Sequence, residues 1–246
     1  MYDSFSCVYD TLMSDADYDG RTEYICDIFK KFGKAPTLLL DLCCGTGSFS
    51  VRFAKKGIGV IGADISPDML DCARKRSAET NTDVLYLCQD AAELDLFGTV
   101  DGAICCLDSI NHITDPEQLQ CVFNKVSLFL EPDCLFIFDV NTPYKHKEVL
   151  ADNTFVIESG NVYCVWQNSY FEEDEITEIN LDFFTEENGV YKRSSQFIEE
   201  RAYGLEKIKG MLLKAGFETV AVYRDMSFEP VTDDCERVVF AALKKV

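Results

Sequence analysis

The stretch Leu38–Ser50, with the sequence LLLDLCCGTGSFS, decides the predicted fold of this chain. It opens with five residues that are apolar apart from Asp41, and so short a run beside a glycine turn predicts a strand buried on both faces. The Gly45–Gly47 loop lets the backbone turn sharply and approach a ligand, because glycine has no Cβ. From Ser48 onward apolar residues recur at helical spacing. Strand, glycine loop and helix in this order are typical of α/β folds that bind nucleotide-like ligands at the carboxyl end of the first strand.

The glycine loop argues against two common classes of ligand. A dinucleotide-binding fingerprint has the form G-x-G-x-x-G, and Ser50 stands where its third glycine would be. The chain has no G-x-x-x-x-G-K-[S/T] phosphate loop. On this stretch alone, an α/β protein with a glycine turn and no nucleotide ligand stays an alternative.

Two further acids close or follow the next predicted strands. The run 58–64, IGVIGAD, ends in Asp64, and an acid at this place can accept hydrogen bonds from both hydroxyls of a ribose. The run 83–88 is followed by Asp90. Together with Asp41, these acids indicate the nucleoside-binding edge of a parallel sheet. They do not choose the cofactor, because enzymes that use NAD and enzymes that use S-adenosylmethionine (SAM) share this feature.

In its motifs the chain resembles the class I SAM-dependent methyltransferases. Asp41, Gly45 and Gly47 match the first motif of that family, a hydrophobic strand followed by D-x-x-C/G-G-x-G. Residues 89–91, QDA, match its x-D-A/M turn. Two other segments, FSCVYDTLM at 5–13 and CLDSINH at 106–112, are similar to the patterns F-x-x-x-Y-D-x-L-M and C-x-D-S-L-N-Y of a group of small bacterial members.

The chain departs from that group at three places. Arg21 stands where the group commonly has Trp, and His112 stands where Tyr is usual. Residues 132–134 read PDC in place of P-G-G before the predicted fifth strand. The resemblance nevertheless extends over nearly the whole chain.

The resemblance implies a Rossmann-like α/β fold whose seven-stranded sheet has the order 3-2-1-4-5-7-6 and is flanked by helices. Between the fifth strand and the last helix, residues 177–183 alternate apolar and polar, and turn signals separate such runs, which predicts about four antiparallel strands. We therefore divide the chain into a SAM-binding core, 1–150 and 199–246, with a lid at 1–33, and a β insertion at 151–198 that covers the substrate site. Tyr2 and Tyr9 belong to this lid.

The resemblance also implies SAM as the cofactor and names the residues around it. The residues expected at the cofactor are Tyr9, Arg21, Asp41, Cys43, Gly45, Thr46, Gly47, Asp64, Ile65, Met69, Asp90, Ala91, Leu107 and Ser109. Asp64 would hold the ribose, Asp90 the adenine amino group, and the loop around Asp41 and Gly45 the methionine end. Met69 would lie near the adenine or simply pack in the core. Arg21 is expected either to pair the SAM carboxylate or to lie on a helix surface.

His112 is the candidate catalytic residue. An imidazole near neutrality can take a proton from an amine or hydroxyl nucleophile, and this segment is expected beside the reacting methyl group. The alternative is a hydrogen-bonded structural histidine before a helix. No metal ion is expected, because SAM already carries a good leaving group and transfer is an in-line displacement.

Composition limits the setting in which the protein acts. The 246 residues include 43 acids and 23 bases, a net charge of −20, which argues against a nucleic-acid substrate. No run of about 20 apolar residues and no signal peptide is present, so we expect a cytoplasmic protein that does not span a membrane. The 12 cysteines include no C-x-x-C, which predicts reduced, mostly buried thiols.

Three functions stay open at this point. The first is methylation of N or O on a small molecule, favoured by the acidic charge and the covered pocket. The second is methylation of a protein or a ribosome-associated macromolecule, which a flat, open β insertion would favour. The third is nucleotide or NAD binding without methyl transfer, against which Ser50 speaks. The acceptor and the oligomeric state are not encoded in these motifs.

Overall fold

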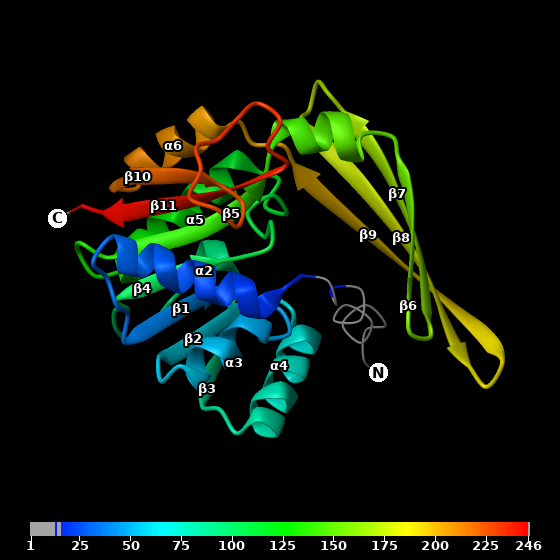
Figure 1. Cartoon of the computed structure of the whole chain (residues 1–246), viewed down its shortest axis with the longest axis horizontal. Coiled ribbons are helices and arrows are strands. Elements are labelled where there is room, and N and C mark those ends of the chain that lie inside the picture. The colour runs from blue at the N-terminus through cyan, green and yellow to red at the C-terminus, as the bar shows by residue number, and fades with distance from the viewer. Residues whose placement is uncertain (1–12, 14–15, 246) are drawn as a thin grey trace.

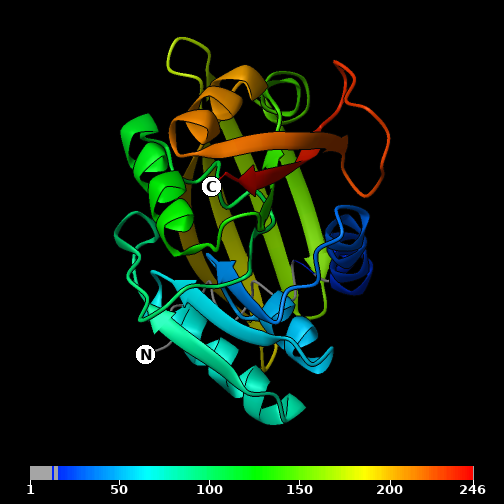
Figure 2. The same ribbon diagram turned by 90° about the vertical axis from the view of Figure 1, so that its left-hand side faces the viewer.

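The structure is a computed structural model that describes residue 13 and residues 16–245. The predicted lid residues Tyr2 and Tyr9 lie outside this part of the chain. The described residues form a seven-stranded sheet with helices on both faces and a separate four-stranded sheet at its side (Figures 1 and 2).

The large sheet confirms the predicted strand order. From edge to edge it runs β10-β11-β5-β4-β1-β2-β3, which is 3-2-1-4-5-7-6 when only the strands of this sheet are numbered. Strands β1 to β5 are parallel to one another, and β11 is antiparallel to both β5 and β10. The strands are β1 (Leu38–Leu42), β2 (Gly59–Asp64), β3 (Val84–Cys88), β4 (Gly102–Cys105), β5 (Leu135–Asn141), β10 (Phe217–Arg224) and β11 (Arg237–Lys244).

Both faces of this sheet are apolar because helices cover both. On one face Leu39 packs with Ile28 and Phe53, which come from α2 and α3. On the other face its neighbour Leu40 packs with Phe123 of α5 and the residues of α6, as the alternation of side chains along a strand requires. The helices are α2 (Tyr18–Lys31), α3 (Ser48–Lys55), α4 (Pro67–Thr80), α5 (Pro116–Phe129) and α6 (Leu205–Lys214).

Two helices begin as their sequences predict. Ser66 and Asp115 are the N-caps of α4 and α5, and each is followed by proline at the first helical position. The Ser66 hydroxyl accepts from the backbone N–H of Met69 at 3.3 Å, and the Asp115 carboxylate accepts from Glu117 at 2.9 Å. These caps place the loops after β2 and β4 at the carboxyl edge of the sheet.

The insertion is a meander of four antiparallel strands, as its period-two pattern predicts. It consists of β6 (Thr154–Ser159), β7 (Val162–Phe171), β8 (Ile176–Glu187) and β9 (Val190–Arg201), and it stands beside the carboxyl edge of the core (Figure 1). Strand β9 continues to Arg201, past residue 198 where we expected the insertion to end. The additional residues place Glu200 in the part of the strand nearest the core.

Asn111 holds the two ends of the insertion together. Its side-chain amide donates to the carbonyl of Asn141, at the end of β5, at 3.1 Å and to that of Arg201, at the end of β9, at 2.9 Å. Its carbonyl oxygens accept from the backbone N–H of the same two residues. A short π-helical segment, η3 (Lys145–Leu150), which the sequence did not predict, connects β5 to β6.

Candidate active site

The loop after β1 is shaped by left-handed backbone and by Asp64. Cys43, Gly45 and Gly47 have φ of 55°, 53° and 73°. The Asp64 carboxylate, at the end of β2, accepts from the backbone N–H of Gly45 at 2.8 Å and of Ser66 at 2.9 Å. The carboxylate therefore ties the glycine loop to the start of α4, and burial raises its pKa.

An open cleft lies where β1 and β4 end. Six of the predicted cofactor residues line it, namely Asp41, Cys43, Gly45, Thr46, Leu107 and Ser109. Tyr18, Cys44, Ser48, Phe49 and Cys106 complete the lining. The structure therefore brings residues of the first and fourth strand ends to one site.

Five more of the predicted cofactor residues, Asp64, Ile65, Met69, Asp90 and Ala91, lie at or after the ends of β2 and β3, whereas Tyr9 lies outside the described residues. Asp64 pairs with Cys88 across β2 and β3, so Asp90 follows directly beside it. Asp90 accepts from the backbone N–H of Ala92 at 2.8 Å, which stabilises the turn after β3. Met69 and Ala91 are half-buried, and Ile65 is exposed. The ribose and adenine roles of these residues stay predictions.

The Arg21 guanidinium pairs with an acid that does not line the cleft. Its two terminal nitrogens donate to Asp225 at 2.8 Å each, and its Nε donates to the carbonyl of Ala16 at 2.9 Å. Such a two-pronged pair fixes the guanidinium in place. The expected contact with the SAM carboxylate therefore stays a prediction, and the geometry favours the structural alternative.

The segment after β4 has an unusual backbone conformation. Leu107 and Asp108 have φ of 56° and 52°, a region in which residues other than glycine are strained. The buried carboxylate of Asp139 compensates by accepting from their two backbone N–H groups at 2.8 and 2.7 Å. Strain of this kind clusters at functional sites, and Leu107 here lines the cleft.

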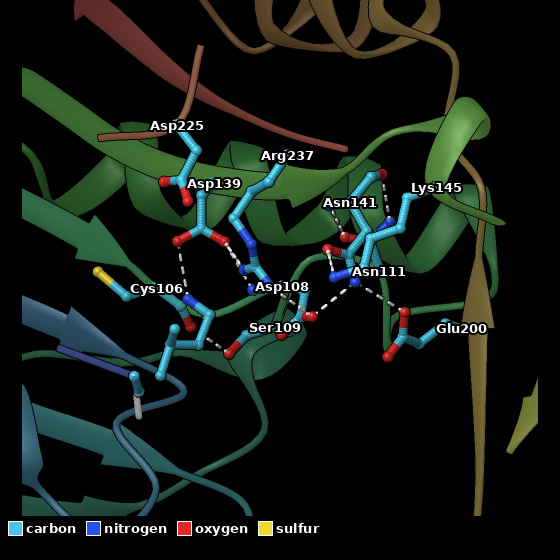
Figure 3. A network of polar contacts seen from close by, with 12 residues as sticks. Cys106, Asp108, Ser109, Asn111, Asp139, Asn141, Lys145, Glu200, Asp225 and Arg237 are labelled. Atoms are coloured by element: carbon cyan, nitrogen blue, oxygen red, sulfur yellow. Dashed lines mark hydrogen bonds and ion pairs between the residues drawn. The ribbon is translucent and has the colours of Figure 1, made fainter. Parts of the chain in front are cut away.

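A buried arginine joins this strand end to β11. Arg237 donates to Asp139 at 2.5 Å and to Asp108 at 2.8 Å (Figure 3). Burial would raise the pKa of Asp108, but the charges of Arg237, His112 and Lys145 outweigh it and hold that pKa well below its usual range. Asp108 is therefore ionised in the folded protein.

A second network of polar contacts extends from the segment after β4 to the insertion. The Asn141 amide donates to Asp108 at 2.6 Å and to Glu200 of β9 at 3.1 Å (Figure 3). Glu200 also lies 3.8 Å from Nε2 of His112 and 3.7 Å from Nε2 of His146. Sequence reasoning identified His112 but missed Asp139, Arg237, Glu200 and His146, because no local motif marks them.

The cysteines are less uniform than predicted. The eleven that the structure describes are all free, which leaves Cys7 outside the described range. Cys105 and Cys164 are buried, whereas Cys88 and Cys121 are exposed. Residues 13 and 16–245 contain no cluster of three or more His, Cys, Asp or Glu suited to a metal ion. None of their helices has the length and apolar character needed to cross a membrane.

Asp41 provides a test of the buried end of β1. Burial raises its pKa to about 7, against a hydrogen bond of 2.5 Å from the Ser50 hydroxyl. Because the folded-state pKa lies above the unfolded value, ionisation opposes folding, and this penalty grows as the pH rises from about 4 to about 7. We expect the free energy of unfolding of Asp41→Asn, relative to that of the wild type, to rise by at least about 1.4 kcal/mol between about pH 4 and pH 7. Urea unfolding at several pH values measures this difference. An unchanged difference between the two proteins would contradict the raised pKa.

Gly47 provides a test of the loop itself. A Cβ at this position would lie 2.5 Å from the Tyr86 hydroxyl and 2.9 Å from Cβ of Ala73, at a φ of 73°. We expect Gly47→Ala to lower the free energy of unfolding by about 2 kcal/mol, the left-handed strain plus the clash. The matched control is Gly57→Ala, whose φ is 82° and whose Cβ would meet nothing within 4 Å. Equal losses in the two variants would show that the clash has no effect.

The features of this site together define a class of protein. A buried parallel strand, a glycine loop with open space at Gly45, and an acid at the end of β2 suit a nucleoside whose hydroxyls bind a carboxylate. The strand order, with β11 antiparallel between β5 and β10, then places this site in a Rossmann-like fold of the methyltransferase type.

Comparison with known proteins leads to the same class. Residues 39–133 match the family described as "Methyltransferase domain". The "Putative methyltransferase YqeM" of Bacillus subtilis (strain 168) is 33% identical, over 99% of this chain and 97% of that protein. This chain belongs to the same family, the class I SAM-dependent methyltransferases, and SAM is its cofactor.

Solved structures agree with the architecture. An SAM-dependent methyltransferase from Clostridium acetobutylicum ATCC 824 superposes with a TM-score of 0.91 at 29% identity, covering 100% of this chain and 99% of that one. The sugar N-methyltransferase KedS8 from Streptoalloteichus sp ATCC 53650 superposes with a TM-score of 0.81 at 17% identity, covering 100% and 94%. The second likeness shows a shared fold.

Proposed function

We propose that this enzyme transfers a methyl group to N or O of a small molecule bound between the β4 strand end and the β insertion. The observation that carries this proposal is the position of the segment 107–112. Leu107 and Ser109 line the cofactor cleft, whereas His112 faces Glu200 of the insertion. An acceptor held against this segment would meet the cofactor on one side and the insertion on the other.

SAM, when bound, would supply an electrophilic methyl carbon for the acceptor's lone pair and a sulfur that takes up the electrons of the C–S bond. The chain's own contribution is alignment and exclusion of water. Asp64 would accept hydrogen bonds from the ribose hydroxyls, and the Gly45–Gly47 loop would hold the methionine end. His112 would take the proton that the acceptor nitrogen or oxygen loses.

Three observations support a small acceptor. The net charge of −20 disfavours nucleic acid. The insertion stands over the same edge of the sheet as the cleft (Figure 1). KedS8, which has this fold, is a sugar N-methyltransferase.

The reducing conditions that free thiols require agree with a cytoplasmic location, which we also propose.

A macromolecular acceptor is the second candidate, and exposed aromatic residues favour it. Tyr163, Phe171, Tyr191 and Phe197 are each at least 40% exposed on the insertion. Such side chains are enriched in surfaces that bind proteins. The two candidates differ in where the methyl group is found after the reaction.

The experiment that distinguishes the two candidates traces the labelled methyl group of SAM. The enzyme is incubated with methyl-labelled SAM and a cell extract, and the products are separated by a membrane that retains proteins and RNA. We expect the filtrate to contain a labelled product that separates from SAM by chromatography, that is absent without the added enzyme, and that is strongly reduced when Asp64→Ala replaces it. Label confined to the retained fraction would overturn the small-molecule proposal in favour of the second candidate.

A further inference from the structure

The chain has only two histidines, and both face the same buried carboxylate. Glu200 is 5% exposed, and one of its oxygens lies 3.8 Å from Nε2 of His112 while the other lies 3.7 Å from Nε2 of His146. The carboxylate comes from β9, whereas the histidines come from the segment after β4 and from η3. Three separate parts of the chain thus converge on one acid.

We propose that Glu200 is a positioning residue, which orients the His112 imidazole so that Nε2 faces the carboxylate and Nδ1 is left to accept a proton from the methyl acceptor. This inference rests on the proposed function and names the group that makes His112 an effective base. It also gives the β insertion a role in the reaction besides enclosing the acceptor.

Glu200 has the isolation that such a role requires. Its pKa is raised by burial and by Asp108, and His112 and Lys145 act in the opposite direction. Asp108 is itself paired with Arg237, and the Lys145 ammonium donates to Asn141 at 3.1 Å. No cation therefore makes a direct ion pair with Glu200 among the described residues, and an imidazolium is the charge that would complement it.

The environment selects His112 over His146. His146 is fully buried, its Nδ1 lies 2.7 Å from the Thr177 hydroxyl, and burial and Lys145 lower its pKa to about 4. It is therefore neutral at neutral pH. The His112 side chain is 41% exposed, so an acceptor can reach it and water can remove the proton afterwards. Of the two imidazoles, only His112 is placed to change its charge during turnover.

The orientation has a direct chemical consequence. A carboxylate beside Nε2 favours the tautomer with hydrogen on Nε2, and Nδ1 then carries the free lone pair. The proton of the acceptor N–H or O–H moves to Nδ1, and its bonding pair stays on the acceptor atom. The imidazolium formed in this step lies against an anion until it releases the proton to solvent.

The first test is NMR on the protein without cofactor or acceptor, where two histidines give two sets of imidazole signals. His112→Asn assigns them. In the wild type we expect His112 to hold hydrogen on Nε2 at high pH. In Glu200→Gln we expect that preference to weaken, with partial rescue by Glu200→Asp. The control is Glu199→Gln, an exposed neighbour whose side chain lies on the opposite face of β9. An unchanged tautomer in Glu200→Gln would overturn the proposal.

The second test is kinetic and uses the acceptor found by the labelling experiment. We expect Glu200→Gln to lower kcat by about 10-fold or more, to leave the KM for SAM unchanged, and to move the acid limb of the kcat profile to lower pH. A residue with a merely structural role would scale the profile without moving the limb. If the wild type methylates no small molecule, the proposed function fails. If the wild type is active and the limb stays in place, only the role of Glu200 fails.

Discussion

Asp64→Ala is expected to weaken SAM binding by at least about 100-fold. A hydrogen bond to a charged group contributes about 1.5–3 kcal/mol, and this carboxylate would accept two from the ribose. Since about 1.4 kcal/mol corresponds to a factor of ten, losing both exceeds a factor of 100. The carboxylate also bonds the backbone of Gly45 and Ser66, so the glycine loop loses a support at the same time. Calorimetric titration with SAM and with S-adenosylhomocysteine measures the loss.

The control for this variant is Asp71→Ala. Asp71 lies on the exposed side of α4 and pairs with Arg74, one turn away, so its removal should leave affinity unchanged. Thermal unfolding of both variants separates lost binding from lost folding. SAM affinity within a factor of three in a folded Asp64→Ala protein would show that the acid at the end of β2 does not hold the ribose.

Arg237→Met is expected to lower the free energy of unfolding by about 3–5 kcal/mol. Removing one partner of a buried ion pair leaves an uncompensated charge, and here two carboxylates, Asp108 and Asp139, would be left facing each other. Asp139 would also be less able to hold the strained backbone of Leu107. Urea unfolding measures the change. The matched control is Arg193→Met, since Arg193 is 63% exposed in its pair with Asp182 and is expected to contribute less than about 1 kcal/mol.

The effect of Arg237 should depend on pH in one direction. The folded-state pKa of Asp108 lies below its unfolded value, so ionised Asp108 stabilises the fold above about pH 4, and this contribution is lost as the pH falls further. In Arg237→Met the ionised acid no longer has its cation. The deficit of the variant should therefore be largest near neutral pH and shrink below about pH 4. A deficit that is constant with pH would mean that packing, and not charge, is what the arginine contributes.

Much of the fold could be predicted because its signals are local. The run at β1, the glycine loop and the caps at Ser66 and Asp115 each lie within a few residues of the feature they determine. The strand order came from the family resemblance, and the insertion came from its period of two. The π-helical segment at Lys145–Leu150 could not be predicted, because no periodicity in the sequence distinguishes it from a loop.

The candidate site divides in the same way. Asp41, Gly45 and Asp64 could be named from the sequence because each occupies a fixed place in a motif, and their roles at the cofactor stay predictions. Arg237 could not be named, because its partners lie 98 and 129 positions away along the chain. Glu200 looked like one of many acids on an acidic strand, and only the packing of β9 against the core shows that it is buried. Arg21 departs from the family pattern, so no motif fixed its role: Asp225 holds the side chain, and the contact with the SAM carboxylate stays a prediction.

The way Asn111 holds both ends of the insertion has a consequence for how such enzymes diversify. Because Asn141 and Arg201 bond to the same amide, the two ends of the insertion stay the same short distance apart whatever the hairpins between them contain. The entropic cost of bringing these two ends together rises only slowly with the length of the connecting chain. Mutation, duplication or grafting can therefore rebuild the hairpins while the sheet that holds the methyl donor keeps its geometry. One catalytic scaffold can in this way give rise to a lineage of enzymes that differ in what they methylate.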